Sequence, residues 1–147
     1  MSQQERTGQC LCGAVTFTAA RLGEFGVCHC VQCRRWAGSA LFGVTVAEAD
    51  MTLQGETHIR AFRSSDWATR CSCAECGSPL WYRYDKGVDG AGDYEITLGL
   101  LDDPNGLPLE KEIFIDQKPD SYALTGEHIR MTRAEVLAKY GVTTEGA

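Results

Sequence analysis

The sequence predicts a mainly β domain that ends in a short helix, and three observations indicate this fold class. Short runs with alternating apolar and polar residues recur along the chain, which is typical of strands that bury one face. Turn-forming residues, above all Gly, Asp, Asn and Pro, separate these runs. Only residues 31–37 and 133–140 have the character of helices. With 147 residues, no linker and no repeat, we expect one domain that spans residues 1–147.

Five segments are expected to form strands. Residues 14–18 place Val15 and Phe17 on one face. Residues 94–100 likewise place Ile96, Leu98 and Leu100 on one face. The five predicted strands are residues 14–18, 41–47, 57–63, 80–84 and 94–100. Residues 85–93 are rich in Gly and Asp and predict a hairpin or a longer loop, and residues 103–106 (Asp-Pro-Asn-Gly) predict a turn.

The helix expected near the C-terminus has recognisable ends. Thr132 can cap its first turn, Glu135 completes a capping box, and Gly141 follows the last apolar residue as a stop signal. The apolar residues of the segment share one face. We therefore expect a helix over residues 133–140 and a shorter one over residues 31–37.

Composition and charge disfavour nucleic acid and membranes as partners. The net charge is -6, and Lys and Arg form no basic stripe that phosphate contacts would need. We find neither a signal peptide nor an apolar stretch long enough to span a bilayer. We expect a cytoplasmic protein, whose thiols stay reduced. Its eight cysteines then indicate metal binding before disulfides, an interpretation that an export route would reverse.

The cysteines form three clusters whose short spacings suit a metal ion. A two-residue spacer lets two sulfurs reach one ion, and zinc prefers a tetrahedron of thiolates at about 2.3 Å. Glycines after Cys12 and Cys76 permit tight turns and leave backbone amides free to donate to sulfur. The clusters are Cys10 and Cys12 (C-x-C), then Cys28, Cys30 and Cys33 (C-x-C-x-x-C), then Cys71, Cys73 and Cys76 (C-x-C-x-x-C).

Spacing alone does not pair the clusters. Eight thiols can form two four-thiolate sites, or one four-thiolate site, one three-thiolate site and a spare cysteine. The cysteine spacing alone supports a purely structural role for every zinc ion as well as it supports a catalytic role, because four-thiolate sites are commonly structural. Cys71 has three interpretations: a spare buried thiol, a redox-sensitive thiol, or a fourth ligand that would close the second site.

Three ordered motifs resemble the glutathione-dependent formaldehyde-activating enzyme family, which also contains centromere protein V. Residues 8–17 (Gly-Gln-Cys-Leu-Cys-Gly-Ala-Val-Thr-Phe) are similar to its opening G-x-C-x-C-G-x-V-x-F. Residues 28–35 are similar to its C-H-C-x-x-C-R-R motif. Ser64, Ser65, Arg70 and residues 73–80 are similar to its third block. The order and the separations agree from residue 8 to about residue 118.

The resemblance implies a fold of layered, tent-like antiparallel β-sheets stapled by zinc. It also implies the pairing that spacing leaves open, with two zinc ions per chain. The closed structural site would be formed by Cys10, Cys12, Cys73 and Cys76. The second, catalytic site would be formed by Cys28, Cys30 and Cys33, with its fourth position open.

The chain departs from the family pattern at four positions. Ser72 stands where the family usually has Phe, and Cys71 is an additional cysteine. Glu112 stands at the position of a family His, and Ser121 at that of a family Trp. The last two lie in a region that shapes the pocket in related proteins.

Several other side chains near the clusters have predicted roles. Arg34 and Arg35 are predicted to bind glutathione carboxylates, and the alternative is that they pair with local acids and offset the anionic zinc sites. His29 is expected to point away from the metal, because neighbours in an extended segment face opposite ways.

Arg70 is expected to have a structural role beside the third cluster. Trp36 and Trp81 are interpreted as packing residues, and His58 and His128 as isolated.

The resemblance implies the activity of an S-(hydroxymethyl)glutathione synthase, a carbon–sulfur lyase that joins formaldehyde to the glutathione thiol. A zinc ion with three thiolates and an open position is a weak Lewis acid that favours exchange of a soft sulfur ligand, so we expect the thiol to bind at the metal. Two alternatives stay open. One is a non-catalytic carrier of glutathione or another thiol, and the other is a purely structural zinc module.

Overall fold

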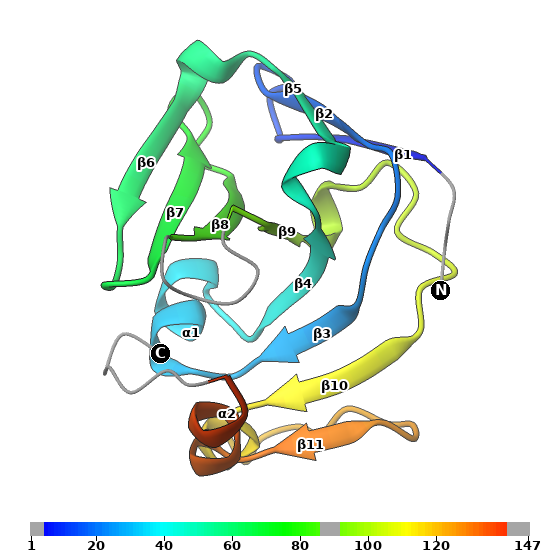
Figure 1. Cartoon of the computed structure of the whole chain (residues 1–147), viewed down its shortest axis with the longest axis vertical. Coiled ribbons are helices and arrows are strands. Elements are labelled where there is room, and N and C mark those ends of the chain that lie inside the picture. The colour runs from blue at the N-terminus through cyan, green and yellow to red at the C-terminus, as the bar shows by residue number, and fades with distance from the viewer. Residues whose placement is uncertain (1–4, 86–91, 141–147) are drawn as a thin grey trace.

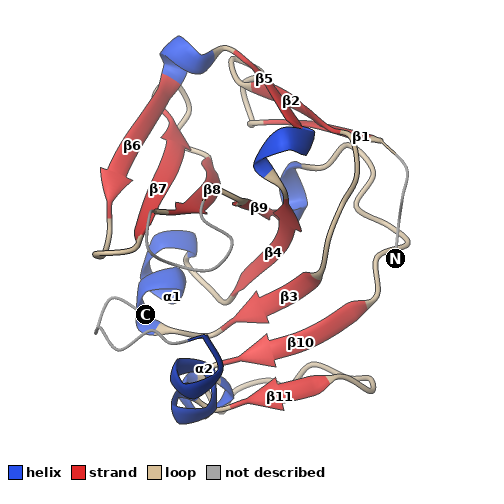
Figure 2. Cartoon of the chain, in the orientation of Figure 1, coloured by secondary structure: helices blue, strands red, loops and turns tan. Residues whose placement is uncertain are grey.

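A computed structural model describes residues 5–85 and 92–140, whose strands form two sheets (Figures 1 and 2). The smaller sheet has the order β1 (Arg6–Gln9), β2 (Thr16–Ala19) and β5 (Met51–Gln54). The larger sheet has the order β11 (Ile129–Met131), β10 (Leu109–Ile113), β3 (Phe25–Cys28), β4 (Leu41–Val46), β9 (Tyr94–Thr97), β8 (Pro79–Tyr84), β7 (Ala68–Cys73) and β6 (Ile59–Arg63). The helices are α1 (Val31–Ala37) and α2 (Arg133–Tyr140), and 3-10 turns occupy Glu48–Asp50, Glu56–His58, Leu98–Leu100 and Ile115–Gln117.

The larger sheet curves, and α1 lies inside the curve while α2 lies beside β10 and β11 (Figure 1). The mainly β class with a short C-terminal helix is therefore confirmed. One aspect of the predicted antiparallel sheets differs, because β10 runs parallel to both β3 and β11. Parallel neighbours need a long crossover connection, and most of the chain lies between β3 and β10.

All five predicted strands exist, with shifted ends. The prediction for residues 94–100 is wrong beyond Thr97, because a 3-10 turn follows in which the Leu101 amide donates to the Leu98 carbonyl at 3.2 Å. This turn directs Leu101 into the core. Residues 57–58 likewise belong to a 3-10 turn that precedes β6. The strands without a sequence prediction are β1, β3, β5, β7, β10 and β11.

The predicted turns are found where the structure describes them. Strands β8 and β9 pair antiparallel, which confirms a hairpin connection, although residues 86–91 of the predicted loop lie outside the described residues. In the turn at residues 103–106, the Asp103 side chain accepts a hydrogen bond from the Asn105 amide at 3.0 Å. This is the local bond by which Asp favours turns.

Both predicted helices are confirmed. The capping box of α2 is formed, because the Thr132 amide donates to Glu135 at 2.8 Å and the Glu135 amide donates to the Thr132 hydroxyl at 3.3 Å. Gly141, the predicted stop, lies outside the described residues. Helix α1 ends at Gly38, which has the left-handed φ of 86°. Among the described helices, none is long and apolar enough to cross a membrane.

The main core joins the two sheets. Trp81 on β8 is buried and meets Phe17 of β2 edge-on, with ring centroids 5.9 Å apart, and it meets Tyr94 of β9 in the same way at 5.5 Å. These contacts confirm Trp81 as a packing residue. A second, smaller core surrounds Cys28, Cys30 and Cys33 and includes Leu41, Tyr82, Phe114 and Val136.

Candidate functional site

Four cysteines from two distant turns form a compact group, which we call the closed cluster. The sulfurs of Cys10, Cys12, Cys73 and Cys76 all lie within 4.8 Å of one another. The Cys10 and Cys12 sulfurs are 3.7 Å apart, and those of Cys12 and Cys73 are 3.8 Å apart. A tetrahedral zinc ion with bonds of about 2.3 Å needs sulfur–sulfur edges of about 3.8 Å, whereas a disulfide needs about 2.05 Å. The closed cluster therefore fits a four-thiolate metal site.

Backbone amides surround the sulfurs of the closed cluster. Amides donate to Cys10, Cys12 and Cys73 at 3.4–3.5 Å. A hydrogen bond from Ser78 lowers the pKa of Cys76 to about 5. Gly13 and Gly77 supply the tight turns with φ values of 83° and 79°. Amide and hydroxyl donors stabilise negative charge on sulfur. The Ala14 amide lowers the pKa of Cys12, but desolvation and the neighbouring cysteines raise it to about 12, so negative charge is not favoured equally on the four sulfurs.

Cys28, Cys30 and Cys33 form a second group, which we call the open cluster. Their sulfurs lie within 4.8 Å of one another, and all three residues are buried. Cys28 ends β3, Cys30 caps α1, and Cys33 lies in the first turn of that helix, where its amide donates to the Cys30 sulfur at 3.4 Å. Hydrogen bonds from the thiols of Cys28 and Cys33 lower the pKa of Cys30 to about 3. The Cys30 thiol in turn raises the pKa of Cys28. The Cys28 thiol lowers the pKa of Cys33, but Cys30 and burial raise it to about 12, so one negative charge in the open cluster is favoured at Cys30.

Arg70 lies beside the open cluster. Its Nη1 and Nη2 atoms each lie 3.6 Å from the Cys33 sulfur. The guanidinium carbon lies over the rings of Trp36 and Tyr82, 5.1 Å from each centroid. The expectation that Arg70 serves the third cysteine cluster is therefore wrong. Adjacent residues on a strand face opposite ways, so sequence proximity to Cys71 misled the assignment. Arg70 places a buried positive charge next to the thiolates.

Cys71 belongs to neither cluster among the described residues. Its side chain is part of the main core, where burial raises the pKa of its thiol. A bulge between Cys71 and Ser72 shifts the register of β7 against β8. The interpretation of Cys71 as a spare buried thiol fits this position.

Replacing Cys71 with alanine is expected to leave metal binding unchanged. The sulfur lies outside both clusters, so the variant should bind as many zinc ions per chain as the wild type, with a stability loss of about 1 kcal/mol. Metal analysis by inductively coupled plasma mass spectrometry, after mild chelation, checks this result. Loss of one ion in Cys71→Ala would show that Cys71 is a ligand.

A cavity of about 500 Å³ opens onto the open cluster. This volume lies within the usual range for small-molecule sites. Gly26 of β3 and Gly43 of β4 form a cross-strand pair in its lining, so part of its wall consists of bare backbone. Phe114, which also lines the cavity, has a left-handed φ of 57° that is unusual for a residue other than glycine. Strained residues of this kind cluster at functional sites.

The cavity has charged side chains that sequence reasoning missed. Glu95 and Lys111 line it together with Arg70. Glu95 lies between Tyr94 and Ile96 on β9, whereas Lys111 lies between two glutamates on β10. Arg34 and Arg35 lie on the other faces of α1 and are not among the described lining residues. Their role as ligands of glutathione carboxylates stays a prediction. Glu95 has no local sequence signal, because its place in the lining depends on the order of the strands.

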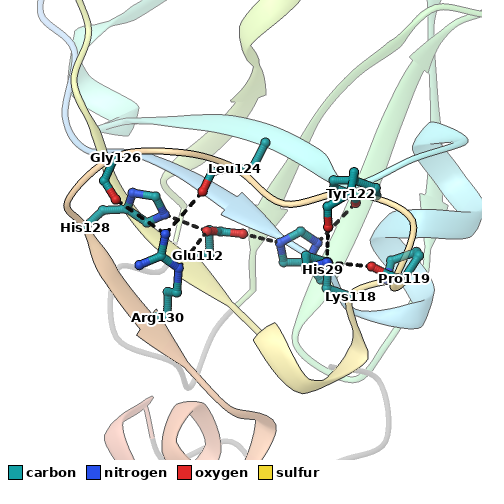
Figure 3. A network of polar contacts seen from close by, with 9 residues as sticks. All are labelled: His29, Glu112, Lys118, Pro119, Tyr122, Leu124, Gly126, His128 and Arg130. Carbon is teal, nitrogen blue, oxygen red and sulfur yellow. Dashed lines mark hydrogen bonds and ion pairs between the residues drawn. The ribbon is translucent and has the colours of Figure 1, made fainter.

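A buried polar network holds His29, which lies between Cys28 and Cys30 in the sequence (Figure 3). The two oxygens of Glu112 contact two histidines, with 2.7 Å to Nε2 of His29 and 2.5 Å to Nε2 of His128. All three side chains are at most 1% exposed, and Arg130 Nε lies 3.3 Å from Glu112. The interpretation of His128 as isolated is therefore wrong. Residue 128 is separated from Glu112 by a long loop, so no sequence spacing indicated the contact.

The network determines how His29 is held between two cluster cysteines. A carboxylate only accepts hydrogen bonds, so Nε2 of His29 carries the proton and donates to Glu112. The opposite atom, Nδ1, lies 3.5 Å from the hydroxyl of Tyr122. The expectation that His29 points away from a metal agrees with these contacts. The backbone amide of His29 also donates to the Ile113 carbonyl at 3.1 Å, which ties the cysteine loop to β10.

The fold and the two thiol clusters define a class of small, mainly β proteins with the ligands of metal centres. Residues 5–117 match the family described as glutathione-dependent formaldehyde-activating enzyme, and the chain belongs to this family. An uncharacterized lyase of Schizosaccharomyces pombe is 28% identical over 134 residues, which cover 90% of this chain and 95% of that protein. The crystal structure of a Rhodobacter sphaeroides protein, 20% identical, covers 70% of this chain and 98% of its own with a TM-score of 0.52. The last similarity shows the fold alone.

Proposed function

We propose that the protein is a zinc-dependent carbon–sulfur lyase that joins formaldehyde, or a related aldehyde, to the thiol of glutathione or a similar molecule. The observation that carries the proposal is the open cluster, three buried thiols that line a cavity of about 500 Å³. Family membership and the lyase relative support this reaction class. A cytoplasmic location is part of the proposal, because the eight cysteines are free thiols and a reducing compartment keeps them so.

The donor sets fit two zinc ions. In the proposal the closed cluster holds a structural ion, and Cys28, Cys30 and Cys33 hold a second ion with one position open. When bound there, zinc would supply a Lewis acid with an exchangeable fourth ligand. The chain itself supplies the charge balance, because Arg70 contacts the Cys33 sulfur and offsets the negative charge of three thiolates.

The cavity can hold the rest of a charged thiol beside the open cluster. Lys111 and Lys139 line it and can pair with substrate carboxylates, and the wall at Gly26 and Gly43 leaves room for an extended backbone. Phe114 and Trp67 provide apolar surface in the cavity lining beside the open cluster. Arg34 and Arg35 remain the carboxylate ligands proposed from the sequence.

The test is the rate at which formaldehyde and S-(hydroxymethyl)glutathione interconvert. Exchange spectroscopy by NMR, with substoichiometric zinc-loaded protein, is expected to show acceleration over the spontaneous reaction. Replacement of Cys30 by alanine should abolish the acceleration while the fold survives, and Cys71→Ala is the matched control that should retain it. Binding of glutathione without acceleration would identify a thiol carrier instead. Two tightly bound ions without any response to thiols would identify a structural module.

A further inference from the structure

Glu95 lies on the wall of the cavity that also carries Arg70. In register, Glu95 of β9 pairs with Tyr82 of β8, and Tyr82 pairs with Arg70 of β7. Directly opposed residues of antiparallel strands share a face, so the three side chains point the same way. With neighbouring strands about 4.8 Å apart, Glu95 lies roughly 10 Å across the sheet from Arg70, which itself reaches the Cys33 sulfur.

One oxygen of Glu95 is held and the other borders the cavity. Oε2 accepts a hydrogen bond from the Thr45 hydroxyl at 2.5 Å. Oε1 lies near Gly43, 3.5 Å from the point where a side chain at that position would begin. Because Gly43 pairs with Gly26, no side chain occupies this part of the wall. The hydrogen bond at Oε2 thus holds the carboxyl group so that Oε1 lies beside the space that a substrate would fill.

Among the described lining residues, Glu95 is the group best suited to exchange a proton near neutral pH. Burial raises the pKa of Glu95 to about 7, although the Thr45 hydrogen bond lowers it. Burial also raises the pKa of Tyr82 and Tyr84 further above its ordinary value of 10, so both phenols stay protonated. Burial lowers the pKa of Lys111, but hydrogen bonds with Tyr140 and Glu24 outweigh it and keep the amine protonated. The charged groups that act on Glu95 are Lys111, Glu24 and Asp93.

We propose that Glu95 is the general base, and in reverse the general acid, for the hydroxyl proton of the hydroxymethyl thiol adduct, a step that rests on the proposed lyase function. In cleavage, Glu95 takes the proton from the adduct hydroxyl and the oxygen electrons form the carbonyl bond. The carbon–sulfur bond breaks, and its electron pair leaves with the sulfur as a thiolate beside the open cluster. In synthesis, the thiolate attacks formaldehyde and protonated Glu95 gives its proton to the carbonyl oxygen.

The test compares Glu95→Gln with Glu110→Gln, a matched change on β10 outside the cavity lining. At pH 7 the enzyme-dependent exchange rate is expected to fall at least about 100-fold in Glu95→Gln and less than twofold in the control. Zinc content and glutathione binding, measured by calorimetry, should match the wild type in both. In the wild type the cleavage rate should rise with pH through a midpoint near 7, and Glu95→Gln should lose this limb.

A second variant keeps the carboxyl group of Glu95 and is expected to change its pKa. Thr45→Val removes the hydrogen bond that lowers the Glu95 pKa, so the midpoint should shift to higher pH. Carbon-13 NMR of labelled glutamate carboxyl groups measures the titration of Glu95 directly and does not depend on enzyme activity. Acceleration that is unchanged in Glu95→Gln, or a midpoint that does not move in Thr45→Val, overturns the assignment of Glu95 alone. A zinc-loaded wild type that accelerates nothing overturns the lyase function and the proposal with it.

Discussion

Replacing Cys73 with serine is expected to abolish cooperative folding at room temperature. The closed cluster joins the turn between β1 and β2 to the turn between β7 and β8, so it fastens the smaller sheet to the larger one. Structural zinc contributes an apparent binding free energy of about 10–16 kcal/mol, as large as the whole stability of a typical domain at about 5–15 kcal/mol. If the closed cluster holds zinc as proposed, loss of one thiolate removes most of this contribution and leaves Cys10, Cys12 and Cys76 without a shared ion.

Circular dichroism during thermal unfolding measures this effect. Cys73→Ser should show no cooperative transition, whereas Cys71→Ala, two residues away on the same strand, should unfold cooperatively near the wild-type temperature. Cys30→Ala, in the open cluster, should also keep its fold, because α1 and β3 retain their packing. A sharp thermal transition in Cys73→Ser with wild-type stability would contradict a structural role for the closed cluster.

Replacing Glu112 with alanine is expected to destabilise the protein by about 3–5 kcal/mol, the usual cost of removing one partner from a buried charge pair. The carboxylate contacts His29, His128 and Arg130, so the truncation leaves three polar groups without their acceptor. Glu112→Gln should lose less, because the amide oxygen still accepts one of these bonds. Urea unfolding of Glu112→Ala and Glu110→Ala gives the comparison, and similar losses in both would contradict a special role for the network.

The contribution of Glu112 should also depend on pH. Burial raises the pKa of Glu112, but the hydrogen bonds from His128 and His29 outweigh it, so the pKa falls below its ordinary value of 4.5. A carboxyl with a lowered folded-state pKa stabilises the fold fully above its unfolded pKa and loses this contribution as pH falls through the folded value. The difference in unfolding free energy between wild type and Glu112→Ala should therefore shrink below about pH 4.5.

The sequence predicted strands correctly where the buried positions of a strand are occupied by apolar residues. The segments at β4 and β8 are rich in β-branched or aromatic residues, and both were found. Strand β10 has the sequence Leu-Glu-Lys-Glu-Ile and was missed, because its inner residues are polar. Lys111 faces the cavity and Glu112 enters the histidine network, so their burial depends on distant partners. Alternation of apolar residues cannot reveal a strand whose buried positions are charged.

The candidate site was likewise predictable only in part from the sequence. The spacing of the cysteines indicated metal binding, but the pairing of residues 10 and 12 with residues 73 and 76 came from the family resemblance, since many pairings satisfy the same spacing. The structure brings these four sulfurs together. Glu95 and the contact of His128 with Glu112 depend on strand order and on a returning loop, and neither has a local signal.

The two clusters differ in how far their ligands are separated along the chain, and this matters while the protein is being synthesised. The open cluster draws on one short segment, so a nascent chain can offer all three thiols soon after residue 33 leaves the ribosome. The closed cluster must bring Cys12 to Cys73, 61 residues later, and is complete only when Cys76 has also been synthesised. Between these events Cys10 and Cys12 lack the two other cysteines of the closed cluster. On the proposed binding of zinc by both clusters, the first ion that the chain captures is therefore held at the open cluster, before the closed cluster is complete.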